Sequence, residues 1–348
     1  MSESQKPPQA GDPLFKRRKS IRITQQALIK TGFHEACGLC PLVVQPMVDA
    51  LNLAAWADGN VGFIDERLDA HGAILFRGFR LPEVSEFEQF VKVTSGEPLT
   101  YSERSSPRSQ VRGAIYTSTD HPPEYPIFLH NEQSYNVTFP ARIFFHCLIA
   151  SETGGQTPIA DTRRVLRRIS AQTRERFERS GYMYVRNFGD GLGLSWQNAF
   201  QTTDPAAVEA YCRANDIEYE WKGEGRLKTW QVRRVTARHV RTGEMVWFNH
   251  ATFFHVSTLD AQIQERLHAE FGNERLPNQT YYGDGTPIPP EVLQELRDAY
   301  LAEKTSFPWQ EGDVLMLDNM LCAHGREPYS GERKVVVGMA RASDWSNV

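Results

Sequence analysis

The sequence predicts a mainly β protein with helical insertions, arranged as an antiparallel barrel, and three observations support this fold class. Short strand patterns bounded by turn residues gather late in the chain. The helix patterns between them never alternate with strands regularly, as a doubly wound parallel sheet requires. No internal repeat and no linker divides the chain. We therefore expect residues 1–13, which are polar and contain proline, to form a disordered lead-in, and residues 14–348 to form a single domain.

The first expected elements are a strand and a helix. The apolar run AILFRGF at 73–79 is typical of a buried strand. Pro82 then opens a helix at 83–95 and Gly96 closes it, because proline suits the first turn of a helix and glycine its end. Residues 99–129 are rich in serine, proline and arginine, which predicts long loops on a sheet.

Strands and helices then follow one another in no fixed alternation. Strand patterns lie at 127–129, 143–149, 182–187, 313–319 and 334–340. Helix patterns lie at 161–180, 204–215, 260–271 and 290–304. The stretch AHGREPYSGE is expected to be a turn between the last two strands, and GDGLGLSW (189–196) a flexible loop that could act as a lid.

Composition and charge exclude several classes of function. With 40% hydrophobic and 24% charged residues, the 348-residue chain has the composition of a folded protein. A net charge of −4 provides no basic field that would collect nucleic acid, so no nucleic-acid partner is expected. No apolar run is long enough for a membrane span and no signal-peptide pattern opens the chain. We expect no membrane partner and a cytoplasmic location.

The five cysteines predict reduced thiols, because they are few and odd in number. Cys37 and Cys40 form a CGLC pair, which could be half a zinc site or a redox dithiol. No second pair follows it, so ordinary thiols are the expected interpretation.

A metal site is predicted in the segment PIFLHNEQSY, which places His130 and Glu132 two residues apart in a strand pattern. Side chains i and i+2 of a strand point to the same face, so these two could bind one metal while Asn131 faces away. His268 and Glu270 have the same spacing in a helix pattern, where such positions are about 200° apart. We expect the second pair to be a solvated helix face.

His324 is the expected third ligand, because it follows the apolar strand DVLMLDN, whose end would deliver it to a pocket. Two histidines and one carboxylate make the facial triad of non-haem Fe(II) oxygenases, which leaves three coordination positions open. The same ligand set also describes a catalytic zinc hydrolase.

Two further residues separate these alternatives. Arg333 opens the strand that follows His324, and a guanidinium can bind a carboxylate through two parallel hydrogen bonds. Thr157, in GGQTPIAD, offers a hydroxyl to the same carboxylate. Arg333 and Thr157 therefore predict a site for the distal carboxylate of a metal-chelating 2-oxo acid, which a zinc hydrolase would not need.

In this order and spacing, the segments HNEQSY, GGQTPIAD, RTGEMVWF, GDVLMLDN and HGREPYSGERK resemble the TauD/TfdA family of Fe(II)/2-oxoglutarate-dependent dioxygenases. The resemblance runs roughly from Ala73 to Arg341 and is strongest to the SyrP-type and clavaminate-synthase-like subgroup, which uses glutamate where taurine dioxygenase uses aspartate. It implies a double-stranded β-helix, or jelly roll, with Fe(II) on His130, Glu132 and His324. It also implies 2-oxoglutarate and O2 as co-substrates.

Two positions depart from the family pattern. A second family arginine, four residues beyond the 2-oxoglutarate arginine, falls at Val337. The HP-x-TG element reads HVRTG at 239–243 and lacks its proline, which leaves the geometry of that loop open.

The resemblance implies hydroxylation of an unactivated carbon, because halogenases of this lineage lack the carboxylate ligand that Glu132 supplies. The expected substrate is an amino acid or amino-acid-derived small molecule of secondary metabolism, such as antibiotic biosynthesis. It could be free or tethered to a carrier protein, and the subgroup favours β-hydroxylation of a tethered amino acid. Candidate substrate-binding residues are Arg104, Arg108, Tyr135 and Asn249. The alternatives are a zinc-dependent hydrolase on the same triad and a catalytically silent jelly-roll binding protein. The oligomeric state is not predicted.

Overall fold

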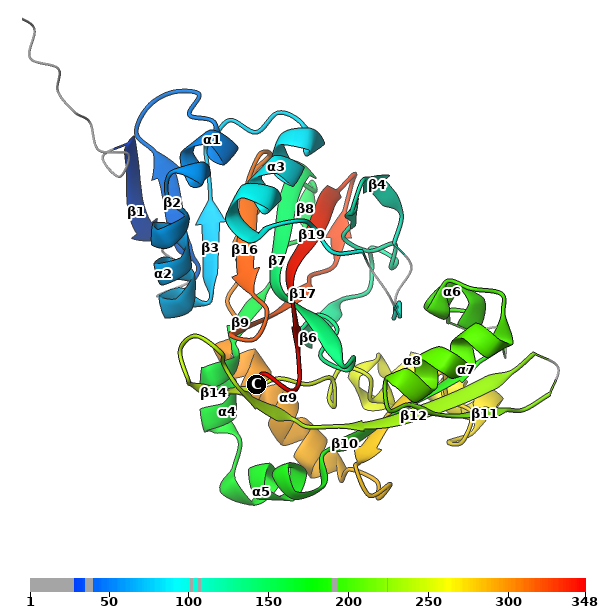
Figure 1. Cartoon of the computed structure of the whole chain (residues 1–348). Coiled ribbons are helices and arrows are strands. Elements are labelled where there is room, and N and C mark those ends of the chain that lie inside the picture. Colours follow the sequence, from blue (N-terminus) through cyan, green and yellow to red (C-terminus); the bar gives the residue numbers. More distant parts are fainter. Residues whose placement is uncertain (1–27, 35–39, 101–102, 106–107, 190–192, 224) are drawn as a thin grey trace, which may run out of the picture.

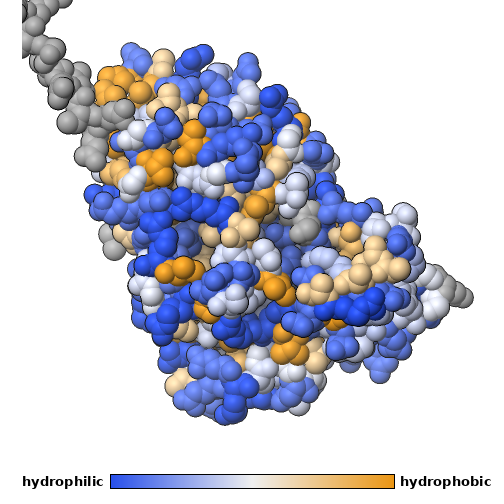
Figure 2. All heavy atoms as spheres, in the orientation of Figure 1, coloured by the Kyte–Doolittle hydropathy of each residue, from blue (hydrophilic) through white to orange (hydrophobic). Residues whose placement is uncertain are grey.

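The computed structural model describes residues 28–34, 40–100, 103–105, 108–189, 193–223 and 225–348, and Figure 1 shows their arrangement. The predicted lead-in at 1–13 lies outside these residues, so it and the single-domain boundary stay predictions. Within the described ranges, no helix has both the length and the apolar character needed to cross a membrane. On the face shown in Figure 2, hydrophobic residues are scattered among hydrophilic ones rather than gathered in one patch.

A sheet of eight strands fills the upper part of Figure 1, in the order β1-β2-β3-β16-β7-β19-β5-β4. Only β2 and β3 pair in parallel; the other pairings are antiparallel. The strands are β1 (Ile29–Phe33), β2 (Leu42–Pro46), β3 (Ala73–Phe76), β4 (Gln110–Arg112), β5 (Ile115–Thr117), β7 (Thr138–Ile149), β16 (Val314–Asp318) and β19 (Lys334–Asp344). Helices α1 (Leu53–Asp58), α2 (Val61–His71) and α3 (Val84–Ser95) lie against this sheet.

The central strands of this sheet are buried on both faces, which explains their unbroken apolar runs. Successive strand residues point to opposite faces. Accordingly, Ile74 and Phe76 of β3 pack in the cluster beneath the helices. Ala73 and Leu75 pack in the cluster on the other face. Strand β16 divides its side chains between the same two clusters.

A smaller sheet faces the inner side of the large one and carries the predicted metal ligands. It has the order β6-β17-β9, with β6 (Ile127–His130), β17 (Cys322–Arg326) and β9 (Ile159–Asp161). Ile159 and Cys322 of this sheet pack in one cluster with Phe145 and Leu315 of the large sheet. The two sheets form the predicted double-stranded β-helix, but they remain separate sheets, so the expectation of a barrel is corrected.

The helical insertions surround a third sheet in the lower part of Figure 1. Its order is β11-β12-β10-β15, with β10 (Tyr182–Phe188), β11 (Glu218–Trp221), β12 (Leu227–Arg233) and β15 (Asn278–Tyr282). The helices of this part are α4 (Thr162–Arg168), α5 (Ala171–Ser180), α6 (Trp196–Phe200), α7 (Pro205–Ala214), α8 (Ala261–Phe271) and α9 (Pro290–Glu303). Two small sheets of two strands complete the fold: the hairpin of β13 (Thr236–Arg238) with β14 (Met245–Trp247), and the long-range pair of β8 (Thr153–Gly154) with β18 (Tyr329–Ser330).

The structure corrects the expected elements at two places. The helix predicted at 161–180 is two helices, because Ser170 caps the start of α5 by accepting a hydrogen bond from the Thr173 N–H. The stretch predicted as a turn at 323–332 contains most of β17 and all of β18. This second correction matters for the site, because it places His324 within a paired strand.

Candidate metal centre and 2-oxoglutarate site

The small sheet brings His130 and His324 together, because β6 and β17 pair with these two residues in register. One ligand atom from each of His130, Glu132 and His324 lies within 4.8 Å of the other two. Glu132 Oε2 is 3.8 Å from His324 Nε2. Two imidazole nitrogens and one carboxylate oxygen therefore converge at one point, as the sequence predicts.

Glu132 reaches this point for a different reason from the predicted one. Strand β6 ends at His130, so Glu132 lies in the turn that follows and not on a strand face. Asn319, in the turn after β16, holds the Glu132 backbone on both sides. Its Oδ1 accepts from the Glu132 N–H at 2.8 Å, and its Nδ2 donates to the Glu132 carbonyl at 2.8 Å. Asn131, which was expected to face away, is buried and donates to the Asn319 carbonyl at 2.6 Å.

Replacing Asn319 is expected to weaken metal binding. Asn319→Ala removes both hydrogen bonds that fix the Glu132 backbone, and loss of such supporting contacts commonly costs about 10- to 100-fold in metal affinity. The measurement is an anaerobic Fe(II) titration of the purified variant, with the exposed Asn347→Ala as control. An Asn319→Ala protein that is folded and binds Fe(II) as tightly as the unmodified chain would contradict this role.

Both histidines present the neutral ring that a metal requires. His130 Nδ1 donates to the Phe128 carbonyl at 2.9 Å, which leaves Nε2 as the ligand atom. His324 Nδ1 is buried and has no hydrogen-bond partner among the described residues. Burial lowers the pKa of both rings, and for His324 the neighbouring His130 and Arg108 lower it further. The donor set thus fits a divalent cation.

Arg333 is a half-buried arginine with no carboxylate partner among the residues that the structure describes. Its Nε donates to the Gly155 carbonyl at 2.8 Å, and its Nη1 lies 3.5 Å from Ser118 Oγ. Burial, together with nearby Arg326, lowers the pKa of Arg333 to about 10. Such an uncompensated cation is costly unless an anion binds it. A carboxylate of 2-oxoglutarate would provide that anion.

Gly155 contacts Arg333 directly, and Thr157 lies two residues further along the chain. Thr157 is buried, and its Oγ1 accepts from Trp309 Nε1 at 3.2 Å, so its hydroxyl hydrogen is available to donate to an anion. Gly155 has a positive φ of 70°, and a Cβ there would lie 2.4 Å from Ser151 Oγ and 3.0 Å from Arg333 Cδ. Glycine is therefore required for Arg333 to lie across this turn.

Gly155→Ala is expected to weaken 2-oxoglutarate binding about tenfold while Fe(II) still binds, because the added methyl group displaces Arg333. The measurement is an anaerobic titration of 2-oxoglutarate into the Fe(II)-loaded protein. Gly62→Ala is the matched control, because a Cβ at position 62 meets nothing within 4 Å. Equal 2-oxoglutarate affinity in the two variants would contradict this prediction.

The two candidate substrate arginines occupy different surroundings. Arg108 Nη2 donates to Glu132 Oε2 at 2.8 Å, so its side chain reaches the metal ligands directly. Arg104 is anchored through its backbone, since its N–H donates to the Ala199 carbonyl and its carbonyl accepts from Arg186 Nη2. Solvated surface arginines were the alternative for both residues, and for Arg108 that alternative is wrong because its side chain is only 6% exposed.

Tyr135 and Asn249 are packed into the interior near the triad. The Tyr135 hydroxyl donates to the Glu103 carbonyl at 2.8 Å, and the ring meets that of His250 edge to face. Asn249 uses both ends of its amide on the backbone, donating to the Val235 carbonyl and accepting from the Ala251 N–H. These contacts give Asn249 a structural role, and its substrate role stays a prediction.

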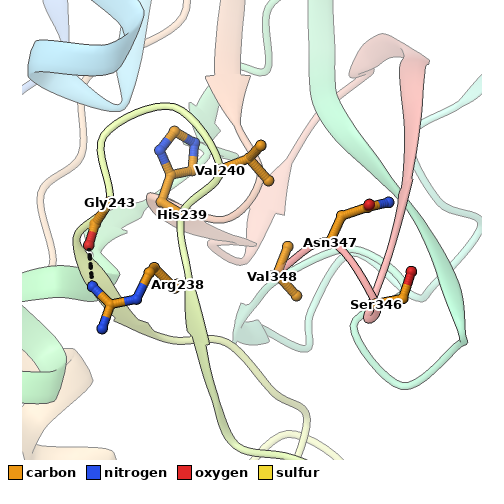
Figure 3. A pocket seen from close by; sticks show the side chains of 7 residues that line it. All are labelled: Arg238, His239, Val240, Gly243, Ser346, Asn347 and Val348. Atoms are coloured by element: carbon orange, nitrogen blue, oxygen red, sulfur yellow. Dashed lines mark hydrogen bonds between the residues drawn. The ribbon is translucent and has the colours of Figure 1, made fainter.

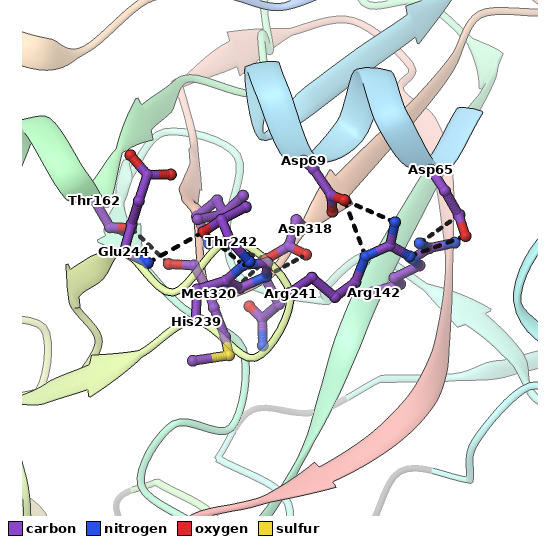
Figure 4. A network of polar contacts seen from close by, with 12 residues as sticks. Asp65, Asp69, Arg142, Thr162, His239, Arg241, Thr242, Glu244, Asp318 and Met320 are labelled. Atoms are coloured by element: carbon purple, nitrogen blue, oxygen red, sulfur yellow. Dashed lines mark hydrogen bonds and ion pairs between the residues drawn. The ribbon is translucent and has the colours of Figure 1, made fainter. Parts of the chain in front are cut away.

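The structure shows the surroundings of the two positions that depart from the family pattern, Val337 and the turn at 239–243. Val337 is fully buried in β19. The turn at 239–243 forms without the family proline, because the His239 ring holds it through two hydrogen bonds (Figure 4). His239 Nε2 donates to Asp318 Oδ2, at the end of β16, at 3.1 Å. His239 Nδ1 accepts from the Thr242 N–H at 3.1 Å. Val240, which stands at the proline position, is exposed.

A hollow of about 280 Å³ lies between this turn and the last residues of the chain (Figure 3). It is lined by Arg238, His239, Val240, Gly243, Ser346, Asn347 and Val348. A second hollow lies on α4 and α9. Neither is lined by a triad residue or by Arg333.

Two other groups of potential metal ligands were not assigned to the site from the sequence. His268 and Glu270 lie on α8 and are exposed, which confirms the expected helix face. Cys40 is a free thiol, and Cys37 lies outside the described residues.

Sequence reasoning missed three residues that shape the site: Asn319, Gly155 and Trp309. A signal existed for Asn319, since an Asp-Asn pair directly after a fully apolar strand marks a turn whose side chains bond backbone groups. Gly155 and Trp309 act through long-range packing, which spacing in the sequence does not reveal.

The jelly roll, the His–Glu–His triad and an arginine that has no carboxylate partner among the described residues together define the scaffold of a non-haem Fe(II)/2-oxoglutarate-dependent oxygenase. Comparison with known proteins agrees. The model of the "Taurine catabolism dioxygenase TauD, TfdA family" matches residues 39–340. The chain belongs to the TauD/TfdA family.

Curated relatives and solved structures extend this comparison. The chain is 42% identical over 276 residues to the dapdiamide synthesis protein DdaC of Enterobacter agglomerans, covering 79% of this chain and 84% of that protein. It is 28% identical over 289 residues to a clavaminate synthase-like protein of Arabidopsis thaliana, covering 80% and 84%. The fold is similar to that of PvcB from Pseudomonas aeruginosa, with a TM-score of 0.54 and 13% identity. The match covers 91% of this chain and 93% of PvcB. The fold is also similar to that of an asparagine oxygenase, with a TM-score of 0.52, 14% identity and coverage of 82% and 79%.

Proposed function

We propose that this Fe(II)/2-oxoglutarate-dependent dioxygenase hydroxylates an unactivated carbon of an amino acid or of an amino-acid-derived small molecule in secondary metabolism. The observation that carries the proposal is the convergence of ligand atoms from His130, Glu132 and His324. When bound, iron and 2-oxoglutarate supply the oxidising chemistry: 2-oxoglutarate, O2 and the substrate C–H give succinate, CO2 and the hydroxylated product.

The residues of the chain bind and orient these groups. His130, Glu132 and His324 would hold the metal, and Arg333 with Thr157 would hold the distal carboxylate of 2-oxoglutarate. Glu132 occupies the position that a halide would need, so hydroxylation is proposed in place of halogenation.

Two similar proteins support the substrate class. One relative takes part in dapdiamide synthesis, and one structural neighbour is an asparagine oxygenase holding a hydroxyasparagine. Among the candidate substrate residues, Arg104 keeps the proposed role of meeting a substrate carboxylate. Arg108 is engaged by Glu132, and the polar groups of Tyr135 and Asn249 are engaged by the backbone.

The metal and co-substrate are tested first, by adding Fe(II) and then 2-oxoglutarate to the purified protein without oxygen. A visible charge-transfer band is expected. A colourless complex whose activity is restored by Zn(II) alone would support the zinc hydrolase instead, and a protein that binds neither group would support a silent binding protein.

The substrate is tested next, by comparing free amino acids with aminoacyl carrier proteins. We propose β-hydroxylation of the carrier-tethered form, which predicts succinate release coupled to a mass gain of one oxygen on the tethered amino acid. Efficient coupled turnover of free amino acids alone would refute tethering and leave hydroxylation standing. The cytoplasmic location is part of the proposal and is tested by cell fractionation.

A further inference from the structure

Arg108 lies where a cation is unexpected. Its Nη2 is 2.8 Å from Glu132 Oε2, and the two side chains are only 6% and 3% exposed. The same carboxylate oxygen lies 3.8 Å from His324 Nε2. A guanidinium beside a metal ligand repels the incoming metal, so its presence requires a compensating function.

The segment that carries Arg108 is fixed on both sides. Upstream, the buried Glu103 accepts from the Tyr211 hydroxyl at 2.9 Å and lies 3.5 Å from Arg186 Nη1. Downstream, the Ser109 N–H donates to Thr117 Oγ1 at 2.9 Å, and the Ser109 carbonyl accepts from the Thr117 N–H at 2.8 Å. Hydrogen bonds thus fix the described residues on either side of Arg108.

The number of coordination positions suggests what this contact does. A six-coordinate metal with two histidines and one carboxylate oxygen has three positions left, of which 2-oxoglutarate takes two and O2 needs one. A carboxylate that binds through both oxygens would take the last position. Arg108 donates to Oε2, the oxygen that lies 3.8 Å from His324 Nε2. A metal that binds Glu132 through one oxygen would share Oε2 with this hydrogen bond or use Oε1, and in both cases the charge-assisted donor competes with binding through both oxygens.

We propose that Arg108 is a positioning residue that holds Glu132 as a one-oxygen ligand and so keeps a coordination position open for O2. The inference rests on the proposed function, because it assumes Fe(II) and 2-oxoglutarate at this site. It assigns to Arg108 a role on the metal ligand in place of the predicted contact with a substrate carboxylate.

The test uses nitric oxide, which binds Fe(II) at an open position in place of O2 and gives a characteristic electron paramagnetic resonance signal. The Fe(II)–2-oxoglutarate complex of the unmodified protein is titrated with nitric oxide without oxygen, beside Arg108→Gln, Arg108→Lys and the control Arg112→Gln. Arg112 is an exposed arginine of β4 that pairs with Glu88, remote from the triad contacts.

We expect Arg108→Gln to bind nitric oxide about tenfold more weakly or worse, because a charged hydrogen bond is lost. Arg108→Lys keeps the charge but not the planar fork, so its affinity should lie between those of Arg108→Gln and the unmodified protein. Arg112→Gln should match the unmodified protein. The charge-transfer band should persist in all four proteins, which shows that metal and 2-oxoglutarate are bound.

Two results of this titration would overturn the inference. One is unchanged nitric oxide affinity in Arg108→Gln. The other is loss of Fe(II) from both Arg108 variants, which would mean that Arg108 is needed for Glu132 to bind the metal at all and does not limit it to one oxygen. A crystal structure of the unmodified protein with Mn(II) and 2-oxoglutarate tests the point without a variant. Both Glu132 oxygens on the metal would refute the inference. Absence of the charge-transfer band in the unmodified protein would refute the proposed function instead.

Discussion

Replacing either metal-binding histidine is expected to abolish Fe(II) binding and turnover. His324→Ala and His130→Ala each remove one of three protein ligands, and the remaining pair cannot hold a divalent cation at micromolar concentration. The measurement is iron content after anaerobic loading and desalting, together with the charge-transfer band. We expect both to be lost.

The sequence provides a matched control for this experiment. His268→Ala removes a histidine of another His-x-acid pair, but this one is exposed on α8. This variant should keep its iron and its rate. Iron retention in His324→Ala equal to that in His268→Ala would remove His324 from the ligand set.

Replacing Arg333 is expected to separate co-substrate binding from metal binding. Arg333→Ala leaves the triad intact but removes the half-buried guanidinium proposed to bind the 2-oxoglutarate carboxylate, so Fe(II) should bind normally. The dissociation constant of 2-oxoglutarate should rise by about 10- to 100-fold, the effect of losing a charged hydrogen-bonded contact of about 1.5–3 kcal/mol.

The measurement is the 2-oxoglutarate dependence of the charge-transfer band at fixed Fe(II). Arg164→Ala serves as the comparison, since this half-exposed arginine of α4 pairs with Glu303. An unchanged 2-oxoglutarate constant in Arg333→Ala would withdraw the co-substrate role of that residue.

The central strands of the jelly roll were predictable because buried strands consist of runs of apolar residues. Strands β3 and β16 are buried at every position and apolar throughout except for Asp318 at the end of β16, since both faces of the sheet are covered. The first strands and helices, between residues 29 and 71, were not predicted. Strand β1 is mostly exposed and α2 buries only Ile64 and Leu68, so neither has a strong periodic signal.

The site was predictable in its members but not in its construction. His130 and His324 could be identified because each ends or occupies a strand, and Arg333 because it directly precedes β19. The placement of Glu132 depends on Asn319, which is 187 residues distant in the chain. The contact between Arg108 and Glu132 likewise depends on how a loop folds back, which no local pattern encodes.

The two hydrogen bonds between the Asn319 side chain and the Glu132 backbone also have a thermodynamic consequence. These bonds join the turn after β6 to the turn after β16. His130 and Glu132 belong to the first part of the chain, and His324 lies in β17, which follows the second turn. A metal bound there cross-links segments that separate completely on unfolding. Its binding free energy therefore adds to the free energy of unfolding, by about 2.7 kcal/mol when free iron is a hundredfold above its dissociation constant. Iron supply would then set the thermal stability and the cellular lifetime of this protein, as well as its rate.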